Sequence, residues 1–347
     1  MKNFLFAVAG ILLSAIVVSD ARAATCTPTG FMRDSINLTA AMINPPGVFT
    51  GDVDATGCNI GIFYGAGAHG ALEGASVHGA NYFGVVRYGA SVPINNSVVY
   101  QIGEQPFNGT QHGVAIYCAD DSPQASPGDI TNNLVYAYQK GGIVVNGGNC
   151  SANIFGNSVI GNGPVNYIAQ NGIEAGDASR VAIANNYVFG NSYTGANEAS
   201  SGGILLFGGA LFGLNYEVNV NVVNNTLIGN DVGIYAVNLD GSGNPASTRT
   251  NINILSNTVQ NNAINNTTGD GPTTGYQAGI VDQGDLDRII GNQICGIGYK
   301  PQTTPTMVVF MVDTTATNHA TSIANGGCGF FDFNNGPHQH RWNWFFH

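Results

Sequence analysis

The stretch Asn132-Asn133-Leu134-Val135 returns, with variations, along most of this chain. Each copy places an Asn after a turn-prone residue and an aliphatic residue two positions later. The spacing between copies runs from 24 residues (Asn133 to Asn157) to 39 residues (Asn186 to Asn225). A repeat of this length is typical of a solenoid, in which equivalent coils stack on one another. The marked asparagines are Asn96, Asn133, Asn157, Asn186, Asn225, Asn257 and Asn292.

The residue before each marked Asn predicts a tight bend. Gly and Asn accept a positive φ angle more readily than other residues, and they fill six of the seven places. Because the bends are equivalent, we expect the marked Asn side chains to stack from coil to coil and to hydrogen-bond to one another, as amides do in other ladders. The preceding residues are Asn95, Asn132, Gly156, Asn185, Asn224, Ser256 and Gly291.

Three columns of aliphatic residues accompany the bends, and none of them has a helical period. Three short β-branched segments per repeat predict three strands per coil. The column after the Asn is Val98, Val135, Val159, Val188, Leu227, Val259 and Ile294. The column before it is Ile130, Ile154, Ile183, Val222, Ile254 and Ile289. The third follows a glycine, in Gly113-Val114, Gly142-Ile143, Gly172-Ile173, Gly203-Ile204, Gly233-Ile234 and Gly279-Ile280.

These columns predict an all-β fold, a single-stranded parallel β-helix in which every strand pairs with its equivalent one coil away. The first copy has Pro93 where the others have an aliphatic residue, which predicts an irregular early coil. A β-propeller has repeats of similar length, but its blades need four strands and tight hairpins, and Asn-Gly hairpin signals are scarce here.

With these repeats, residues 60 to 300 resemble secreted bacterial proteins of the pectin-lyase-like superfamily, which carry right-handed parallel β-helix repeats. The resemblance implies a right-handed coil and a polysaccharide as the partner. It leaves the activity open, because pectate lyases, polygalacturonases, epimerases and adhesins share these repeats. Two functions therefore stand side by side: a lyase or glycoside hydrolase, and a non-catalytic surface, adhesive or structural protein.

The chain begins like an exported protein. Lys2, an apolar run over residues 4–18 and Ala21-Arg22-Ala23 predict a signal peptide over residues 1–23. No later stretch reaches 18 apolar residues, so we expect a secreted, extracellular or periplasmic protein without a membrane anchor. The expected parts are an N-terminal cap over 24–60, the β-helix over 61–296 and a C-terminal cap over 297–347.

All six cysteines follow the predicted cleavage site, and an even number in an oxidising compartment favours disulfides over metal ligands. Six cysteines allow 15 connectivities. Sequential pairing is the one we expect, because it would fasten the two caps and link neighbouring coils. The expected pairs are Cys26–Cys58, Cys118–Cys150 and Cys295–Cys328.

The charge balance limits the partners. Without the signal peptide the chain keeps 8 basic and 20 acidic residues, a net charge of −12. Nucleic acid is therefore not an expected partner. A polyanionic glycan would be repelled unless Ca²⁺ bridged it, so either Ca²⁺ takes part or the ligand is neutral. Asp285-Leu286-Asp287 and Asp52-Val53-Asp54 could hold Ca²⁺, although solvated loop carboxylates explain them more simply.

If the third column points inward, residues three positions before it and one after it face outward. The earlier set is Gln111, Lys140, Gln170, Ser201, Asp231 and Gln277, and the later set includes Glu174 and Tyr235. Lys140 could be the base of a uronan lyase, and Glu174 with Asp231 could be the acid and base of a hydrolase.

We expect Gln111, His112, Gln170 and Tyr235 to contact the substrate, between walls built by the insertions 207–217 and 239–250. The simpler alternative is that all of these residues are solvated polar positions of a flat, non-catalytic face.

Overall fold

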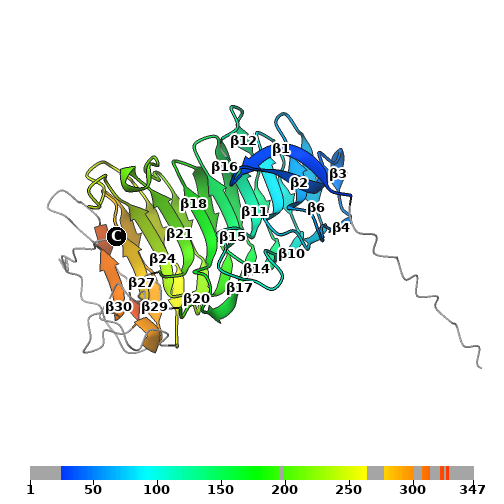
Figure 1. The fold of residues 1–347 in the computed structure, drawn as a ribbon. Coiled ribbons are helices and arrows are strands. Elements are labelled where there is room, and N and C mark those ends of the chain that lie inside the picture. The colour runs from blue at the N-terminus through cyan, green and yellow to red at the C-terminus, as the bar shows by residue number, and fades with distance from the viewer. Residues whose placement is uncertain are drawn as a thin grey trace, which may run out of the picture.

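The computed structural model is an elongated spiral of short strands that form three long sheets, here named A, B and C (Figure 1). It describes residues 25–119, 121–195, 199–263 and 277–299, and the strands at 307–312, 321–323 and 326–327. The predicted signal peptide lies outside these residues. Among the described residues, no helix has the length and hydropathy of a membrane-spanning segment.

Each coil contributes one strand to each sheet, in the order A, B, C. Sheet A contains β1 (Thr27–Arg33), β2 (Ile36–Ile43), β5 (Ile60–Tyr64), β8 (Phe83–Tyr88), β11 (Val114–Ala119), β15 (Gly141–Asn146), β18 (Asn171–Gly176), β21 (Gly202–Gly208), β24 (Val232–Asn238), β27 (Gln277–Asp282) and β30 (Met307–Val312). Two short 3₁₀ helices, η1 (Ala210–Phe212) and η2 (Ile297–Tyr299), interrupt the loops.

Sheets B and C repeat the same arrangement. Sheet B contains β3 (Gly47–Phe49), β6 (Gly70–Glu73), β9 (Ile94–Asn95), β12 (Ser126–Pro127), β13 (Ile130–Thr131), β16 (Cys150–Phe155), β19 (Arg180–Ala184), β22 (Asn221–Val223), β25 (Asn253–Leu255), β28 (Arg288–Ile290) and β31 (Thr321–Ile323). Sheet C contains β4 (Asp52–Asp54), β7 (Ser76–His78), β10 (Val98–Ile102), β14 (Leu134–Tyr138), β17 (Ser158–Val165), β20 (Tyr187–Tyr193), β23 (Thr226–Ile228), β26 (Thr258–Gln260), β29 (Gln293–Cys295) and β32 (Gly326–Gly327).

Strands of successive coils pair in parallel, which confirms the predicted parallel β-helix. Ile143 of β15 lies opposite Ile173 of β18, and Ile173 lies opposite Ile204 of β21. All three side chains are fully buried in one continuous core. The aliphatic columns of the sequence are therefore the inner walls of the spiral, except that Val99 and Ile116 take the inward places predicted for Val98 and Val114.

The marked asparagines form a ladder between sheets B and C. The side-chain amide of Asn157 donates to Oδ1 of Asn186 at 2.9 Å, and the backbone N–H of Asn157 donates to the same oxygen at 2.9 Å. The second amide hydrogen reaches the carbonyl oxygen of Ile130 in the previous coil at 2.8 Å. The same bonds join Asn133, Asn157, Asn186, Asn225, Asn257 and Asn292 in one file. Each ladder Asn thus satisfies buried polar groups on two neighbouring coils.

The first copy of the repeat has a different register from the prediction. Asn96 is the bend residue, with φ of 50°, and the buried Ser97 occupies the ladder position, its N–H donating to Oδ1 of Asn133 at 2.9 Å. Ile94, three residues before Ser97, is then the buried aliphatic residue, so this coil is regular and Pro93 lies outside the column. The prediction was wrong here because Asn95-Asn96 resembles the bend and ladder residues of the other copies, such as Asn132-Asn133.

The early coils also start sooner than the prediction. β2, β3 and β4 lie within residues 24–60, yet they already supply one strand to each sheet and pair in parallel with β5, β6 and β7. Only β1 lies outside the spiral, because it pairs antiparallel with β2. Phe31 of β1 packs over the outer face of sheet A, with ring centroids 5.2 Å from Tyr88 and 5.8 Å from Phe63.

Two of the expected disulfides form. Cys26–Cys58 joins the first strand to the first coil, and Cys118–Cys150 joins neighbouring coils inside the core. They confirm those two pairs and fit an oxidising compartment. The third expected pair, Cys295–Cys328, includes a residue outside the described part of the chain.

A buried carboxylic acid lies at the corner between sheets A and B. Glu217 is fully buried and accepts hydrogen bonds from the Ser179 hydroxyl at 2.9 Å and from the Ser179 backbone N–H at 2.9 Å. Burial raises the pKa of Glu217 to about 8, although the hydrogen bonds from Ser179 lower it. The folded chain therefore holds a proton on Glu217 more tightly than the unfolded chain does.

We expect Asn186→Ala to lower the free energy of unfolding by about 2–5 kcal/mol, because it removes the partner of two buried donors on Asn157. Asn253, which is half-buried on the outer face of β25 and donates to Asn221 at 2.9 Å in an exposed hydrogen bond, provides the control. Denaturant unfolding of both variants measures the difference. Equal losses for Asn186→Ala and Asn253→Ala would mean that the ladder contributes no more than a surface amide.

Stability should also fall as the pH rises from about 4.5 toward 8. Because the pKa of Glu217 is about 8 in the folded chain against 4.5 for an ordinary Glu, its contribution is complete below pH 4.5 and is lost as pH passes 8. Glu217→Gln should remove this slope, a difference of at most about 5 kcal/mol. Unfolding of wild type, Glu217→Gln and the partly exposed control Glu73→Gln across this range tests it. A slope that survives in Glu217→Gln would assign it to other groups.

Candidate functional site

The candidate site lies where the chain passes from sheet C to the outer face of sheet A. Lys140 is the last residue before β15, and its Nζ donates to the carbonyl oxygen of Ala169 in the next coil at 3.0 Å. The strands of sheet A start one residue later, so the residue three before the inward aliphatic one belongs to a corner. The outward stripe predicted from strand pleating is therefore a row of corner residues.

Lys140 and Glu174 come together on neighbouring coils. Glu174 is half-buried on the outer face of β18, and Asn171 of the same strand donates to its Oε2 at 3.0 Å. Burial raises the pKa of Glu174, and the Lys140 charge and the Asn171 hydrogen bond oppose this shift. Burial lowers the pKa of Lys140, and the Glu174 charge opposes it. Burial therefore shifts both pKa values against the charged forms, that of the amine downward and that of the acid upward.

His112 and Glu104 lie one coil earlier along the same corner. His112 Nε2 is 2.8 Å from Oε1 of Glu104, and the imidazole stacks on the Tyr82 ring with centroids 3.8 Å apart. The backbone N–H of Lys140 donates to the carbonyl oxygen of Gly113, the residue after His112, at 2.9 Å. The two pairs therefore belong to adjacent coils of one surface.

Gln139 fixes this arrangement, and it was not among the residues predicted for the site. Its buried amide donates to the carbonyl oxygen of Thr110 at 2.8 Å and accepts from the backbone N–H of Glu104 at 3.2 Å and of Asn108 at 3.1 Å. It thereby holds the loop that carries Glu104 and His112 against the residue next to Lys140. The available signal was its place directly before the one lysine of the repeat region.

Asp231 is not part of this cluster. It precedes β24, three strands along sheet A from β15, which corresponds to about 14 Å. Its carboxylate is buried and accepts from the Ser192 hydroxyl at 2.8 Å and from the Tyr193 N–H at 2.7 Å. These bonds hold the corner between β20 and β21, so Asp231 has a structural role in this arrangement.

The predicted substrate contacts have different surroundings. Gln170 is fully buried, and its amide donates to the carbonyl oxygen of Tyr138 at 2.7 Å, so it braces the corner. Gln111 is exposed in the loop. Ile116, not Val114, pairs with Ile143, so the residue three before the inward aliphatic one is Gly113, and Gln111 lies outside the row of corner residues. Tyr235 is two strands from Glu174 on the outer face and packs against Val232, Ala278 and Val281.

The insertions also lie elsewhere than expected. Residues 207–217 and 239–250 follow the carboxyl ends of β21 and β24, whereas Lys140 lies before the amino end of β15. They therefore flank the opposite edge of sheet A. The loop 103–113, which carries Glu104 and His112, is the rim next to Lys140.

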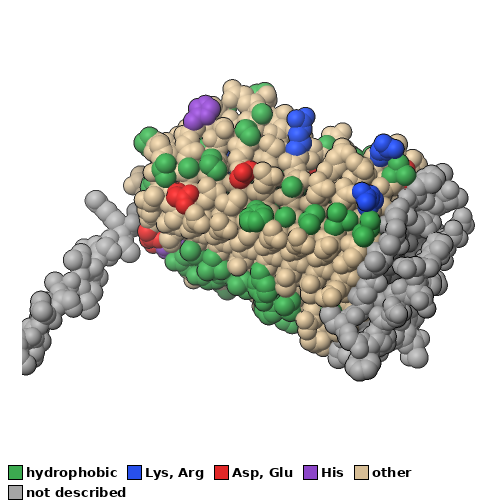
Figure 2. Space-filling model, turned by 180° about the vertical axis from the view of Figure 1, so that it is seen from behind, with side chains coloured by type: hydrophobic (Ala, Val, Ile, Leu, Met, Phe, Trp, Pro, Cys, Tyr) green, Lys and Arg blue, Asp and Glu red, His purple; other side chains and the backbone are tan. Residues whose placement is uncertain are grey.

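Two further surfaces lie on the other sheets. A groove of about 670 Å³ on the outside of sheet B is lined by residues 127–129, 151–153, 178–182 and 218–219. Figure 2 shows the molecule from behind, where rows of hydrophobic side chains cross a mostly uncharged surface.

On sheet C, the rings of His78 and Tyr100 stack with centroids 4.8 Å apart, and those of Tyr100 and Tyr136 stack with centroids 5.1 Å apart. Their faces cover one another, so they brace the sheet and leave only edges for a ligand.

The acidic pairs considered for Ca²⁺ differ in exposure. Asp285 and Asp287 are buried, which excludes the interpretation as solvated carboxylates. Oδ1 of Asp287 accepts from the Thr250 hydroxyl at 2.7 Å and from the Ile252 N–H at 2.6 Å, so it fixes the corner before β25. Within the described part of the chain, no group of three or more His, Cys, Asp or Glu side chains is arranged to hold a metal ion.

Comparison with known proteins finds only distant structural likenesses. The chain matches no protein-family model and no curated protein. Among solved structures, DFA-IIIase of Arthrobacter chlorophenolicus A6 in complex with GF2 is 14% identical, with 83% of this chain and 69% of that chain covered and a TM-score of 0.43. The mannuronan C-5 epimerase AlgE4 A-module of Azotobacter vinelandii is 13% identical, with 88% and 90% covered and a TM-score of 0.26. These likenesses are too distant to carry an argument, so function is argued from the side chains.

The lowered pKa of Lys140 can be measured directly, because residues 24–347 contain only one other lysine, Lys300. After reductive ¹³C-methylation, the signal that disappears in Lys140→Arg should titrate below the ordinary lysine value of 10.5. In Glu174→Gln it should titrate lower still, because the opposing negative charge is gone. A titration at or above 10.5, or no response to Glu174→Gln, would contradict the described pair.

Proposed function

We propose that this protein is an exported polysaccharide-binding β-helix that cleaves a uronic-acid-containing glycan by β-elimination on the outer face of sheet A. The observation that carries the proposal is the Lys140–Glu174 pair on neighbouring coils, in which burial lowers the pKa of the amine and raises the pKa of the acid. The two disulfides and the predicted signal peptide support export.

Each side chain has a defined part in this reaction. The neutral amine of Lys140 removes the proton from C5 of the uronic acid. The electron pair of the C5–H bond forms the C4=C5 double bond, and the C4–O bond to the leaving sugar breaks. Protonated Glu174 gives its proton to the leaving oxygen, so the cluster ends as an ammonium and a carboxylate. Asn171 holds the Glu174 carboxyl group in place throughout.

A hydrolytic mechanism has less support. Glycoside hydrolases place two carboxyl groups roughly 5–9.5 Å apart on either side of the bond that breaks. Glu174 and Asp231 lie two strands apart, about 10 Å, and Asp231 faces into a corner where its oxygens already accept hydrogen bonds. Glu104, the other nearby acid, is engaged by His112.

The net charge of the mature chain does not prevent an acidic glycan from binding here. At physiological salt, charges more than about 8 Å away are largely screened, so the groups at the site decide. In the proposed mechanism Lys140 enters as the neutral amine and Glu174 as the neutral acid, so neither side chain repels a sugar carboxylate.

The experiment is an activity screen on the purified mature chain. Pectate, alginate and other uronans, with neutral glycans beside them, are incubated with and without Ca²⁺. Absorbance of the new C4=C5 double bond and reducing ends are both followed. We expect both signals to rise together on one acidic glycan. Lys140→Ala should lower kcat at least about 100-fold, and Glu174→Gln about as much, because each removes one proton-transfer group.

Glu73→Gln is the matched control, since Glu73 lies at the end of β6 on sheet B, and it should keep near wild-type activity. Full lyase activity in Lys140→Ala would eliminate the proposed base. Reducing ends without the double-bond signal would make the protein a hydrolase. Glycan binding without either signal would favour the non-catalytic platform.

A further inference from the structure

The groove on the outside of sheet B, which the proposed function does not use, has the features of a binding site. It crosses neighbouring coils and is lined partly by small side chains, among them Ala152, Ala178 and Ala182. Its volume of about 670 Å³ falls within the roughly 300–1,000 Å³ of small-molecule sites. Among the described residues that line it, none is aromatic. Its polar groups therefore decide what it can bind.

The polar groups of the groove differ from one end to the other. Oδ1 of Asp129 accepts from the backbone and side-chain N–H groups of Asn153, at 3.1 and 3.0 Å, so Asp129 Oδ2 and Asn153 Oδ1 are left as acceptors. Two coils further on, Oδ1 of Asn219 accepts from Asn251 at 2.8 Å, which leaves the Asn219 amide as a donor. On the coil between them Arg180 is exposed, and with the described residues it forms no ion pair. The groove thus offers acceptors at one end and donors at the other.

The strand register sets the distance between the two charges of the groove. Asp129 lies one coil before Asn153, because the residue after it, Ile130, pairs with Ile154. Arg180 lies one coil after Asn153, opposite Ser151. Asp129 and Arg180 are therefore two strand spacings apart, about 10 Å along the axis of the spiral. The two charges act on different parts of a ligand that lies along this axis.

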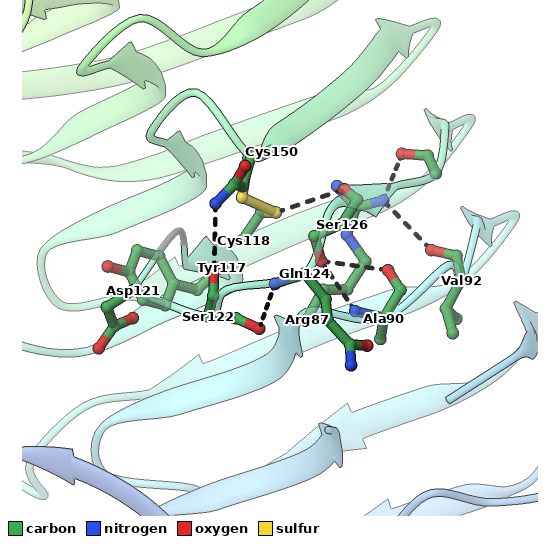
Figure 3. The surroundings of a disulfide bond; sticks show 12 residues. Arg87, Ala90, Val92, Tyr117, Cys118, Asp121, Ser122, Gln124, Ser126 and Cys150 are labelled. Atoms are coloured by element: carbon green, nitrogen blue, oxygen red, sulfur yellow. Dashed lines mark hydrogen bonds between the residues drawn. A yellow bond between two sulfur atoms is a disulfide. The ribbon is translucent and has the colours of Figure 1, made fainter. Parts of the chain in front are cut away.

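The walls of the groove are fixed by buried hydrogen bonds. Figure 3 shows Arg87 beside the Cys118–Cys150 disulfide, and this buried guanidinium donates to the carbonyl oxygen of Gly128 in the groove lining. At the opposite wall the hydroxyl and the N–H of Ser179 each donate to the buried Glu217 at 2.9 Å. A groove held in this way needs little ordering when a ligand binds, which favours affinity.

We propose that this groove binds a chain of uronic acid sugars, as a second site apart from the cleavage site on sheet A. The identity of the glycan rests on the proposed function. The carboxylate of one sugar pairs with Arg180, whose planar guanidinium matches two carboxylate oxygens. Hydroxyls of the chain donate to Asp129 and Asn153 and accept from the Asn219 amide. A neutral glycan does not use the charge of Arg180, and a compact anion has no hydroxyl to offer Asp129.

Titration of methyl-labelled protein with hexamers of galacturonate and mannuronate tests the site, with a neutral glucose hexamer for comparison. In the Lys140→Ala variant, which lacks the proposed base, the methyl signals of Ala178 and Ala182 should respond to a uronate hexamer and not to the neutral one. Arg180→Gln should weaken this affinity at least about 10-fold, because a charge-assisted pair is lost. Arg288→Gln should keep it, since it removes the same charge from an exposed place on sheet B outside the groove.

Asp129→Asn separates recognition of a sugar from simple attraction of an anion. The variant removes a negative charge, so affinity would rise if the groove only attracted anions. Because Oδ2 of Asp129 accepts from a sugar hydroxyl in the proposed site, we expect affinity to fall by about 2- to 10-fold. The same methyl signals measure the change.

The proposal is overturned if no uronate hexamer moves the Ala178 and Ala182 signals, or if the neutral hexamer binds as tightly. It is also overturned if Arg180→Gln and Arg288→Gln bind alike, or if Asp129→Asn binds more tightly than its parent. Failure of the proposed function gives a different result, in which the wild type cleaves no uronan although the groove still binds a hexamer through Arg180. Failure of the groove alone leaves cleavage that depends on Lys140 intact.

Discussion

The hydrogen bonds between stacked asparagines are the constraint on which this structure depends. Each ladder Asn gives its amide hydrogens to the next Asn and to a carbonyl of the previous coil, and its oxygen accepts two donors. A bend buried between two sheets would otherwise leave these groups unpaired, at about 1–3 kcal/mol each. Because the ladder fixes one residue per coil, every other position is held in register, and the interior becomes a set of stacked columns.

The candidate site lies where one coil has a different residue type from the equivalent position of other coils. Lys140 follows Gln139 at the corner before sheet A, where later coils have the uncharged or acidic residues Gln170, Ser201 and Asp231. A charged residue at such a corner is partly withdrawn from water, which is why the pKa values of Lys140 and Glu174 shift. The interior also contains a charged residue, because Arg87 occupies a place that is taken by Cys118 and Val145 in the next two coils.

The fold could be predicted from the sequence because its signals repeat. The bends and the aliphatic columns recur in every coil, and two disulfides link cysteines that are neighbours in the sequence. The pattern was still clear although the ladder position of the first copy was assigned to Asn96 instead of Ser97. A second ladder, in which Asn191 donates to Asn230 at 3.0 Å, was also readable, since each member follows a marked Asn by five residues. The site was less predictable, because the alternation of side chains along a strand does not hold at corners, and the predicted site residues lie at corners. Lys140 and Glu174 meet, but Gln170 and Asp231 turn inward to satisfy the corners, a local choice that no periodicity encodes.

The ladder is tested most directly by residue-resolved hydrogen exchange of its backbone amides. The N–H groups of Asn133, Asn157, Asn186, Asn225 and Asn257 all donate to a side-chain oxygen of the next coil. The account predicts that they exchange as slowly as the central strand amides of sheet A, although they lie at bends. Exchange as fast as that of the exposed loop around Gln111 would contradict it, because the coils would then lack their shared register.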